Sequence, residues 1–278
     1  MMNVFYENHA GERIDLNSEN IILQYQEFFN YSWDAATRNR KIKGFKRDSA
    51  TLPVTVAVTA ETEDEYLQII EEFYRITEKD ILAVAPGKLY INEYYLRCYI
   101  SGDIKQDAFK GILFQIKNLT LVTDYPFWIK ETTYQYFPEP PEAVKYTELE
   151  EGIMFPEFPF DFCTETGEEV LINPSFNDSN FIMTIYGFAE NPQLNIAGHP
   201  YKVEATINEG EQLVINSLTH TVQKIGRLGE ITNLYNARGK IYSVFKKIPP
   251  GTNTLQWSGG FGIDIILFDE RSEPKCSL

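Results

Sequence analysis

The chain has 278 residues, enough for two ordinary domains or one large β domain, and 43% of them are hydrophobic. Its 25 Lys and Arg against 40 Asp and Glu give a net charge of −15, which argues against direct nucleic-acid recognition because phosphates would be repelled. Aromatic residues reach 14%, an excess that favours β-strands, where rings pack on pleated faces.

The three cysteines, Cys98, Cys163 and Cys276, are too widely spaced to indicate a disulfide framework or a metal-ligand cluster. The first residues lack a basic start followed by an apolar run, so no signal peptide is expected. No stretch approaches the roughly 20 apolar residues of a membrane span. We therefore expect synthesis in a reducing cytoplasm and no membrane insertion.

Residues 51–60 alternate strictly between apolar and polar side chains, which predicts a half-buried strand. The next segment predicts the one helix of this half, because Thr62 and Glu65 have the spacing of a capping box. Apolar residues then follow at helical spacing: Tyr66, Ile69, Ile70, Phe73 and Ile76. From residue 81 the period of two returns, and the sequence predicts a strand, a turn at Pro86-Gly87 and another strand.

The composition changes at Pro138, where five prolines and many acids occur within 23 residues. Prolines cannot donate ladder hydrogen bonds, so residues 138–162 are predicted to form a linker or crossing arm. The aromatic residues of this linker, together with Met154, predict that it lies on a surface of the protein.

The second half consists of about eight short alternating runs separated by turn residues, and residues 208–210 indicate a hairpin loop. This spacing is typical of a β-sandwich or jelly roll. The predicted fold is therefore mainly β. Its parts are an N-terminal β domain with one α-helix (residues 1–137), the Pro-rich linker (138–162) and a C-terminal sandwich (163–278).

Enzyme constellations are not evident. The histidines His9, His199 and His220 (the last on a predicted strand) lie in no HExxH motif, and no GxSxG elbow occurs. The glycines of residues 258–262 lead into a strand, so they do not form a phosphate loop. A glycosidase pair among the 40 acids stays open in principle, but solvated surface is the favoured interpretation. We expect no catalytic residues, no cofactor and no metal.

One basic cluster stands out in this acidic chain, in the segment TRNRKIKGFKRD. It comprises Arg38, Arg40, Lys41, Lys43, Lys46 and Arg47. A solvated loop or hairpin is the simplest interpretation. The more specific one is an inter-subunit interface, in which the cluster meets an acidic patch on the next copy and head-to-tail contacts close into a ring. A nucleic-acid site is the least favoured.

Near the end, the segment IPPGTNTLQWSGG carries an alternating run behind a tight connection at Pro249-Pro250-Gly251. Trp257 in this run could stack on a sugar, as in carbohydrate-binding modules. A place in the core, with Leu255, is the favoured alternative.

The runs GEQLVINSLTHTVQKIG, SVFKKIPPGTNTLQWSG and FDERSEPK occur here in order. Together they resemble the distal tail proteins of long non-contractile-tailed bacteriophages and their prophages. In the first half, PGKLYINEYYLRCYI and DYPFWIKETTY are similar to the N-terminal domain of the same proteins. The familiar ending has an aromatic residue where this chain has Cys276.

The resemblance implies a structural protein of the virion tail tip, assembled in the bacterial host cytoplasm. Its N-terminal domain would form a homo-hexameric ring, and a galectin-like C-terminal sandwich would project outward. The implied partners are further copies, the tail tube protein, the tail-tip hub or tail-associated protein, and a receptor-binding protein. The alternative function is a β-sandwich module that recognises host cell-wall glycan, although the short loops leave no room for an inserted carbohydrate-binding module.

Overall fold

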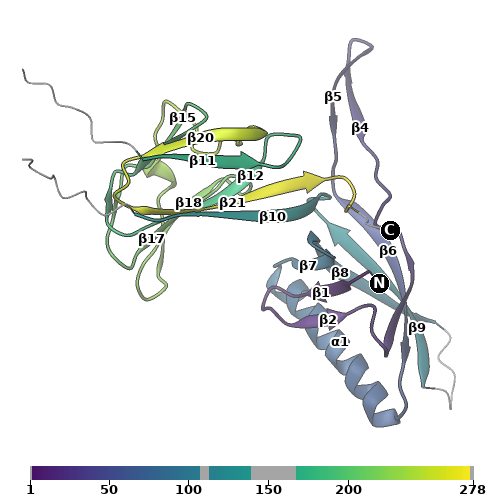
Figure 1. Ribbon diagram of the computed structural model, residues 1–278. Helices are drawn as coiled ribbons and strands as arrows, with labels where there is room; N and C mark the ends of the chain where they lie inside the picture. The colour runs from purple at the N-terminus through teal and green to yellow at the C-terminus, as the bar shows by residue number, and fades with distance from the viewer. Residues whose placement is uncertain (1, 107–112, 139–166, 276–278) are drawn as a thin grey trace, which may run out of the picture. The chain divides into compact units, whose positions relative to one another are not determined.

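A computed structural model describes residues 2–106, 113–138 and 167–275 (Figure 1). The chain divides into two compact units, Met1–Lys130 with Glu270–Leu278, and Glu131–Asp269. Among the described residues the first unit holds one α-helix and the second is built of strands and one short 3-10 turn, so the mainly β prediction is confirmed. The predicted Pro-rich linker lies outside the described residues from residue 139 onward.

The units divide between Lys130 and Glu131 rather than after residue 137, and from Glu270 the chain returns to the first unit. The chain crosses the division within two continuous strands, β10 and β21, whose bounds are given below. Proline interrupts only at residue 138, after β10 has ended. The change of composition therefore marks the end of a strand and not the border of a compact unit.

The first unit has these elements in chain order: β1 (Val4–Glu7), β2 (Arg13–Asp15), β3 (Ile21–Gln26), β4 (Asp34–Arg38), β5 (Lys41–Lys46), β6 (Ala50–Thr59), α1 (Glu63–Ala83), β7 (Gly87–Ile91), β8 (Tyr94–Gln106), β9 (Phe114–Thr123) and the start of β10 (Trp128–Tyr136). The central strand is β8. Its first part continues through β7 and β1 to β2, and its second part continues through β9 and β6 to β3, all antiparallel. Within the second part, the register of β8 against β9 shifts between Ile100 and Gly102, as a β-bulge does when it bends a strand.

Helix α1 begins as its sequence predicts. The Thr62 hydroxyl accepts a hydrogen bond from the Glu65 N–H at 3.2 Å, and the Glu65 carboxylate reaches back to the Glu61 N–H at 2.9 Å. The helix buries Phe73 and Ile76 in the core of the first unit.

The strand predicted from residue 81 is wrong, because α1 continues through Ala83 and ends at Val84, whose φ of 51° is left-handed. The buried series runs on at helical spacing from Phe73 and Ile76 to Asp80, and this carries the helix one turn further. The tight turn is not at Pro86-Gly87. It lies between β7 and β8, with Asn92 at φ 53°.

Removal of the cap is expected to weaken this helix measurably. Thr62→Ala should lower the free energy of unfolding by about 1 kcal/mol, because one N–H of the first turn loses its acceptor. Thr77→Ala in the same helix is the matched control, since the Thr77 hydroxyl only donates to the carbonyls of Phe73 and Tyr74 within the helix. Urea unfolding followed by circular dichroism measures both. Equal losses for the two variants would contradict the capping role.

The second unit has these elements: the rest of β10, β11 (Gly167–Asn173), β12 (Asn180–Tyr186), β13 (Ala189–Glu190), β14 (Gln193–Ile196), β15 (His199–Lys202), β16 (Thr206–Ile207), β17 (Gln212–Asn216), β18 (Thr221–Ile225), β19 (Ile231–Asn233), η1 (Tyr235–Ala237), β20 (Gly251–Trp257) and β21 (Gly262–Arg271). One sheet has the order β19-β18-β17-β12-β21-β10, and the other has the order β11-β20-β14-β15. Apolar side chains of both sheets share one core, so the predicted sandwich is confirmed.

Trp257 is a core residue with 3% of its surface exposed, as the favoured interpretation expects. Its indole N–H donates to the Phe261 carbonyl at 3.1 Å, and its ring meets that of Tyr136 edge-on at 5.8 Å. The connection before β20 turns at Gly251, whose φ of 85° suits glycine, and the Asn253 amide donates to the Pro249 carbonyl at 2.9 Å.

The prediction of a hairpin loop at residues 208–210 is wrong, because the two strands beside it do not pair with each other. A turn is present, closed by the Glu211 N–H on the Asn208 carbonyl at 3.0 Å. However, β16 before it pairs with β13, whereas β17 after it pairs with β12 and β18. Turn chemistry is local, but the choice of strand partner depends on the whole sandwich.

Candidate functional site

The basic cluster lies on a long hairpin, residues 34–46, here called the arm, which projects from the first unit (Figure 1). Among the described strands, β4 and β5 pair only with each other. The turn residues Asn39 and Arg40 both have left-handed φ, 53° and 60°, as a two-residue type I′ turn requires. Such a turn matches the twist of the two strands and thereby fixes their register.

The structure places the six predicted residues as follows: Arg38 ends β4, Arg40 lies in the turn, Lys41, Lys43 and Lys46 lie on β5, and Arg47 follows β5. Arg38 and Lys41 are brought directly opposite each other. Lys46 forms an ion pair with Asp48 at 2.7 Å, both side chains being more than half exposed. Five of the six therefore lie on the arm, and Arg47 lies at its base.

The register gives the arm two different faces. Ala35 lies opposite Phe45 and Thr37 opposite Ile42, so these four side chains share one largely apolar face. The other face carries the opposed pair Arg38 and Lys41, together with the pair Asp34 and Lys46. A register shift between Ala36 and Thr37 takes up the extra residue Lys43.

The apolar face of the arm has no cover among the described residues. Phe45 is 60% exposed and Ile42 59% exposed. An isolated two-stranded hairpin is marginally stable in water, and large exposed apolar side chains at one place mark interaction sites. The charge cluster in the sequence did not reveal this face, although alternation about an Asn39-Arg40 turn could have found it.

Arg47 differs from the other five basic residues because it is partly buried against aromatic rings of the first unit. Its guanidinium lies 5.1 Å from the ring centre of Phe127, 5.7 Å from that of Trp33 and 5.8 Å from that of Tyr31, beside a cavity of about 330 Å³. Burial lowers the pKa of this guanidinium, and its Nη1 atom is buried without a hydrogen-bond partner among the described residues. Arg47 thus contacts the first unit at the base of the arm.

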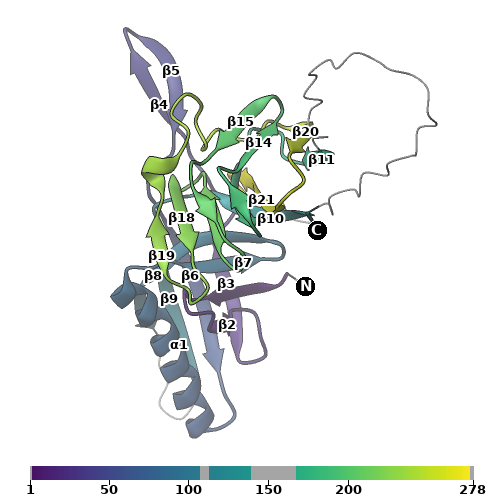
Figure 2. The same cartoon turned by 90° about the vertical axis from the view of Figure 1, so that its left-hand side faces the viewer.

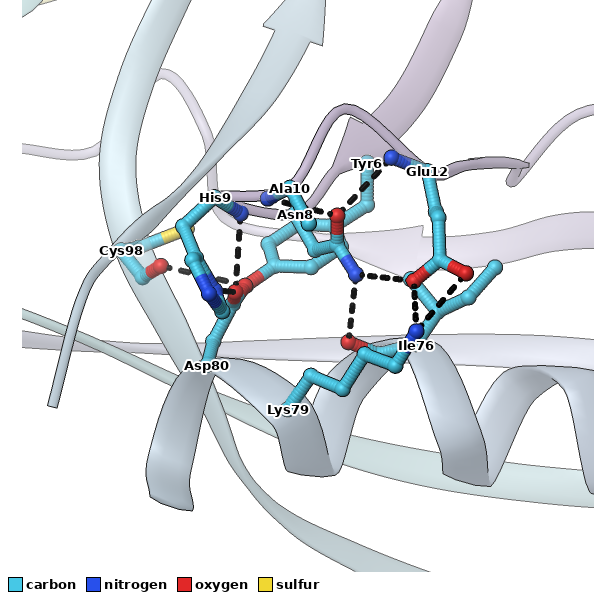
Figure 3. A network of polar contacts seen from close by, with 9 residues as sticks. All are labelled: Tyr6, Asn8, His9, Ala10, Glu12, Ile76, Lys79, Asp80 and Cys98. Atoms are coloured by element: carbon cyan, nitrogen blue, oxygen red, sulfur yellow. Dashed lines mark hydrogen bonds and ion pairs between the residues drawn. The ribbon is translucent and has the colours of Figure 1, made fainter. Parts of the chain in front are cut away.

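A second cluster of polar groups joins the N-terminal strands to α1 (Figure 3). The Asp80 side chain is fully buried and accepts hydrogen bonds from the Tyr6 hydroxyl at 2.5 Å and from the His9 N–H at 2.9 Å. The His9 ring nitrogen Nδ1 also lies 2.5 Å from the Asp80 carboxylate. A Cβ on Gly87 would lie 2.4 Å from the Tyr6 hydroxyl, so the backbone can approach this cluster only as glycine.

This cluster is built for packing rather than for nucleophilic chemistry. Burial raises the pKa of the Tyr6 hydroxyl far above its usual value, and it raises that of the nearby Cys98 thiol to about 12. Neither group therefore supplies an anion near neutral pH. The other two histidines lie elsewhere, and His220, predicted on a strand, lies in the turn before β18 with φ 54°.

Glu12 extends the cluster to the surface of α1. It binds Lys79 at 2.7 Å and Arg75, and the Asn8 amide donates to it at 2.8 Å. The hydrogen bonds from Lys79, Asn8 and Arg75 lower the pKa of Glu12 to about 2. The ionised carboxylate is thus the form that the folded state prefers.

Low pH is expected to remove the stability that the ionised Glu12 carboxylate contributes. Because the folded pKa lies below the ordinary value of 4.5, the stability from Glu12 is complete above about pH 4.5 and is lost as the pH falls toward 2. Glu12→Gln should therefore lower the melting temperature at pH 7 and flatten its fall across this window. Thermal unfolding at a series of pH values checks this, with the exposed helix variant Glu71→Gln as control. Parallel pH curves for wild type and Glu12→Gln would contradict it.

Among the described residues, no group of three or more His, Cys, Asp or Glu side chains is placed to hold a metal ion. Within the same residues, no helix is both long and apolar enough to cross a membrane. Cys98 is a free buried thiol, whereas Cys163 and Cys276 lie outside the described residues.

Comparison with known proteins gives matches by structure only. No protein-family model and no curated protein sequence matches the chain. The chain is similar to the Dit protein of phage SPP1. The crystal structure of that protein is described as a paradigm of the hub adsorption apparatus in phages that infect Gram-positive bacteria. The match covers 97% of this chain and 99% of that one, with a TM-score of 0.58 and 11% identity.

A chain of the phage p2 baseplate in its activated conformation is similar as well. The match to the structure with Sr covers 99% of this chain and 100% of that one, with a TM-score of 0.63 and 9% identity. The match to the structure with Ca has the same coverage and identity and a TM-score of 0.60. At these identities the comparisons establish a shared fold over nearly the full length of the chains.

Proposed function

We propose that the chain is a structural component of a phage tail tip. Copies of it, six in number, form a ring that joins the tail tube to the tail-tip hub or baseplate and the host-recognition apparatus. The observation that carries this proposal is the shared fold with the SPP1 Dit protein and the p2 baseplate chain, which extends over 97% and 99% of this chain. The order of the sequence segments that resemble distal tail proteins supports it independently.

The arm supplies the contact between copies. Its face with Ile42 and Phe45 packs against the next subunit, and its basic residues meet acidic groups there. In a chain of net charge −15, a local basic element finds complementary acidic surface readily on another copy. Each subunit gives one arm and receives another, which is a head-to-tail contact that closes into a ring.

The two open faces of such a ring provide the other contacts. The tail tube protein would bind on one side, and the tail-tip hub or tail-associated protein on the other, with a receptor-binding protein attached to the assembly. The subunit acts through its shape and surfaces and catalyses no reaction. Its place is the virion tail tip, after assembly in the bacterial cytoplasm.

Mass and shape of the purified protein test the ring. Light scattering should give about 193 kDa, six times the chain mass of 32.1 kDa, and negative-stain images should show rings with a central opening. Some rings form only on a template, so the measurement is repeated after co-purification with the proteins encoded beside it. A monomer in both experiments would overturn the proposal.

Glycan recognition by the second unit is the alternative function. The burial of Trp257 speaks against the residue that could have served it, because both its ring and its N–H are engaged in the core. We expect the full chain to leave a glycan array silent. Binding that is lost on replacement of exposed tyrosines in the second unit would instead favour the alternative.

A further inference from the structure

The second unit carries a basic surface of its own. Residues 231–263 contain no Asp or Glu, and their four basic residues lie in the loop between β19 and β20: Arg238, Lys240, Lys246 and Lys247. In a chain with 40 acids, a stretch of 33 residues without one concentrates positive charge at this loop. Residues 235–247 are called the basic loop below; they follow β19, labelled in Figure 2.

The basic loop is held firmly although it has little regular structure. Val244 and Ile248 are fully buried, and Ile248 exchanges backbone hydrogen bonds with Ser179. The Tyr201 hydroxyl donates to the Lys246 carbonyl at 2.8 Å, and the His199 ring lies 2.9 Å from the Ser243 carbonyl. Side chains on this loop are therefore presented from a fixed backbone, which lowers the entropy cost of binding.

Apolar and aromatic residues alternate with the basic residues along this loop. Ile241 is 88% exposed and Tyr242 53% exposed. The Arg238 guanidinium lies 3.7 Å above the Tyr235 ring, which stacks on Phe245 at 6.0 Å. Large apolar side chains beside basic groups suit a partner that brings both carboxylates and rings.

The described residues leave most of this charge unpaired. No ion pair among them involves Arg238, Lys240 or Lys246. Glu204, whose backbone N–H donates to the Ala237 carbonyl at 2.7 Å, is paired with Lys202 at 3.4 Å. Binding an acidic partner here therefore breaks no existing ion pair of these three residues.

A segment with the complementary chemistry belongs to the same unit of the chain. Residues 139–166 contain eight acids and one Lys, a net charge of −7, and four phenylalanines: Phe155, Phe158, Phe160 and Phe162. This is nearly half of the net charge of the chain. The segment follows β10 and precedes β11, so both of its ends are tied to the unit that carries the basic loop.

We propose that the basic loop is the docking surface for residues 139–166 of the same chain. The carboxylates meet Arg238, Lys240 and Lys246, and the phenylalanines cover Ile241 and Tyr242. A segment of 28 residues can span roughly 90 Å, far more than a domain of this size requires. Tethering at both ends gives a local concentration on the order of millimolar, which favours the chain's own segment over any free partner. This docking occurs within one subunit and does not depend on ring formation.

Zero-length carboxyl–amine cross-linking of the full chain tests the contact directly. A mixture of ¹⁴N- and ¹⁵N-labelled protein is treated with a carbodiimide, and the linked peptides are identified by mass. We expect links from acids of residues 139–166 to Lys240 and Lys246 within single-isotope peptides. The ion pair of Lys46 with Asp48 is the internal positive control. Links only between differently labelled chains, or none while the control pair links, would overturn the proposal.

Hydrogen exchange of two matched variants gives the second test. Reversal of the four basic residues of the basic loop to Glu should speed exchange in residues 139–166 about tenfold, as the segment undocks. Reversal of Arg38, Arg40, Lys41 and Lys43 on the arm changes the net charge equally and should leave that exchange unchanged.

Ile241→Ser alters one exposed side chain without changing charge, and it is the variant to use should the quadruple variant fail to fold. It should also speed exchange in the segment. Wild-type exchange rates in residues 139–166 of a folded variant would overturn the docking, whatever the oligomeric state. Loss of the ring with docking retained would instead contradict only the proposed function.

Discussion

Replacement of Arg38, Arg40, Lys41 and Lys43 by Glu is expected to convert the purified ring into monomers at physiological salt. The change turns a basic arm into an acidic one, so that it repels the acidic surface that it met on the next copy. Lys46 and Arg47 are left in place because Lys46 is paired with Asp48 and Arg47 contacts three aromatic rings at the base of the arm. Light-scattering mass over a range of protein concentrations measures the effect.

The apolar face is expected to matter as much as the charge. Ile42→Ser with Phe45→Ser removes the two most exposed apolar side chains of the arm, at a cost of about 2 kcal/mol per interface, or about thirtyfold in affinity. The folded monomer should be unaffected, because neither side chain belongs to its core. High salt should weaken the wild-type ring less than charge reversal does, since the apolar contact is not screened.

The matched control reverses Arg238, Lys240, Lys246 and Lys247 in the second unit. It shifts the net charge by the same amount and should leave the ring intact, since these residues lie outside the arm. Rings indistinguishable from wild type in the arm variant would remove the arm from the interface. Loss of rings in both variants would point to net charge rather than to a specific contact.

Asp80→Ala is expected to destabilise the first unit by about 3 kcal/mol or more. It leaves the His9 N–H without its acceptor and the Tyr6 hydroxyl with only the Cys98 carbonyl at 3.3 Å, and it also opens a small cavity. Tyr6→Phe removes only one donor and should cost about 1–2 kcal/mol. Chemical unfolding of both single variants and of the double variant measures the coupling between the two side chains.

The double variant should lose clearly less stability than the sum of the two single losses, because removing the Asp80 acceptor makes the Tyr6 hydroxyl a liability that phenylalanine lacks. Additive effects would show that the two groups do not act as one cluster. Gly87→Ala provides an independent check, since its methyl group would overlap the same hydroxyl. It should destabilise the unit without removing any polar group.

The polar cluster around Asp80 and the arm differ in whether their contacts lie within one subunit. The cluster satisfies its own donors and acceptors within one subunit, so a monomer has no unmet need there. The arm leaves Ile42 and Phe45 uncovered by the described residues, as a surface that meets another molecule does. For this reason we propose the arm as the contact between copies and the cluster as a source of stability within one subunit.

Short-range pattern was enough to predict several features of the fold. Alternation predicted the sandwich strands, the Thr62 cap and the acids behind it predicted where α1 begins, and one charge run predicted the segment that became the arm. These signals are local, because side-chain period, capping and turn chemistry act over a few residues. The core position of Trp257 followed from the same alternation.

Features that depend on partners far away in the chain could be read only from the folded protein. The last turn of α1 was settled by the buried Asp80, whose partners Tyr6 and His9 lie more than 70 residues away in the chain. The separation of Arg47 from the other basic residues, and the apolar face formed by Ile42 and Phe45, required the register of the arm and the rings beneath it. A one-dimensional pattern records which side chains are present, whereas burial and pairing depend on which distant segment packs against them.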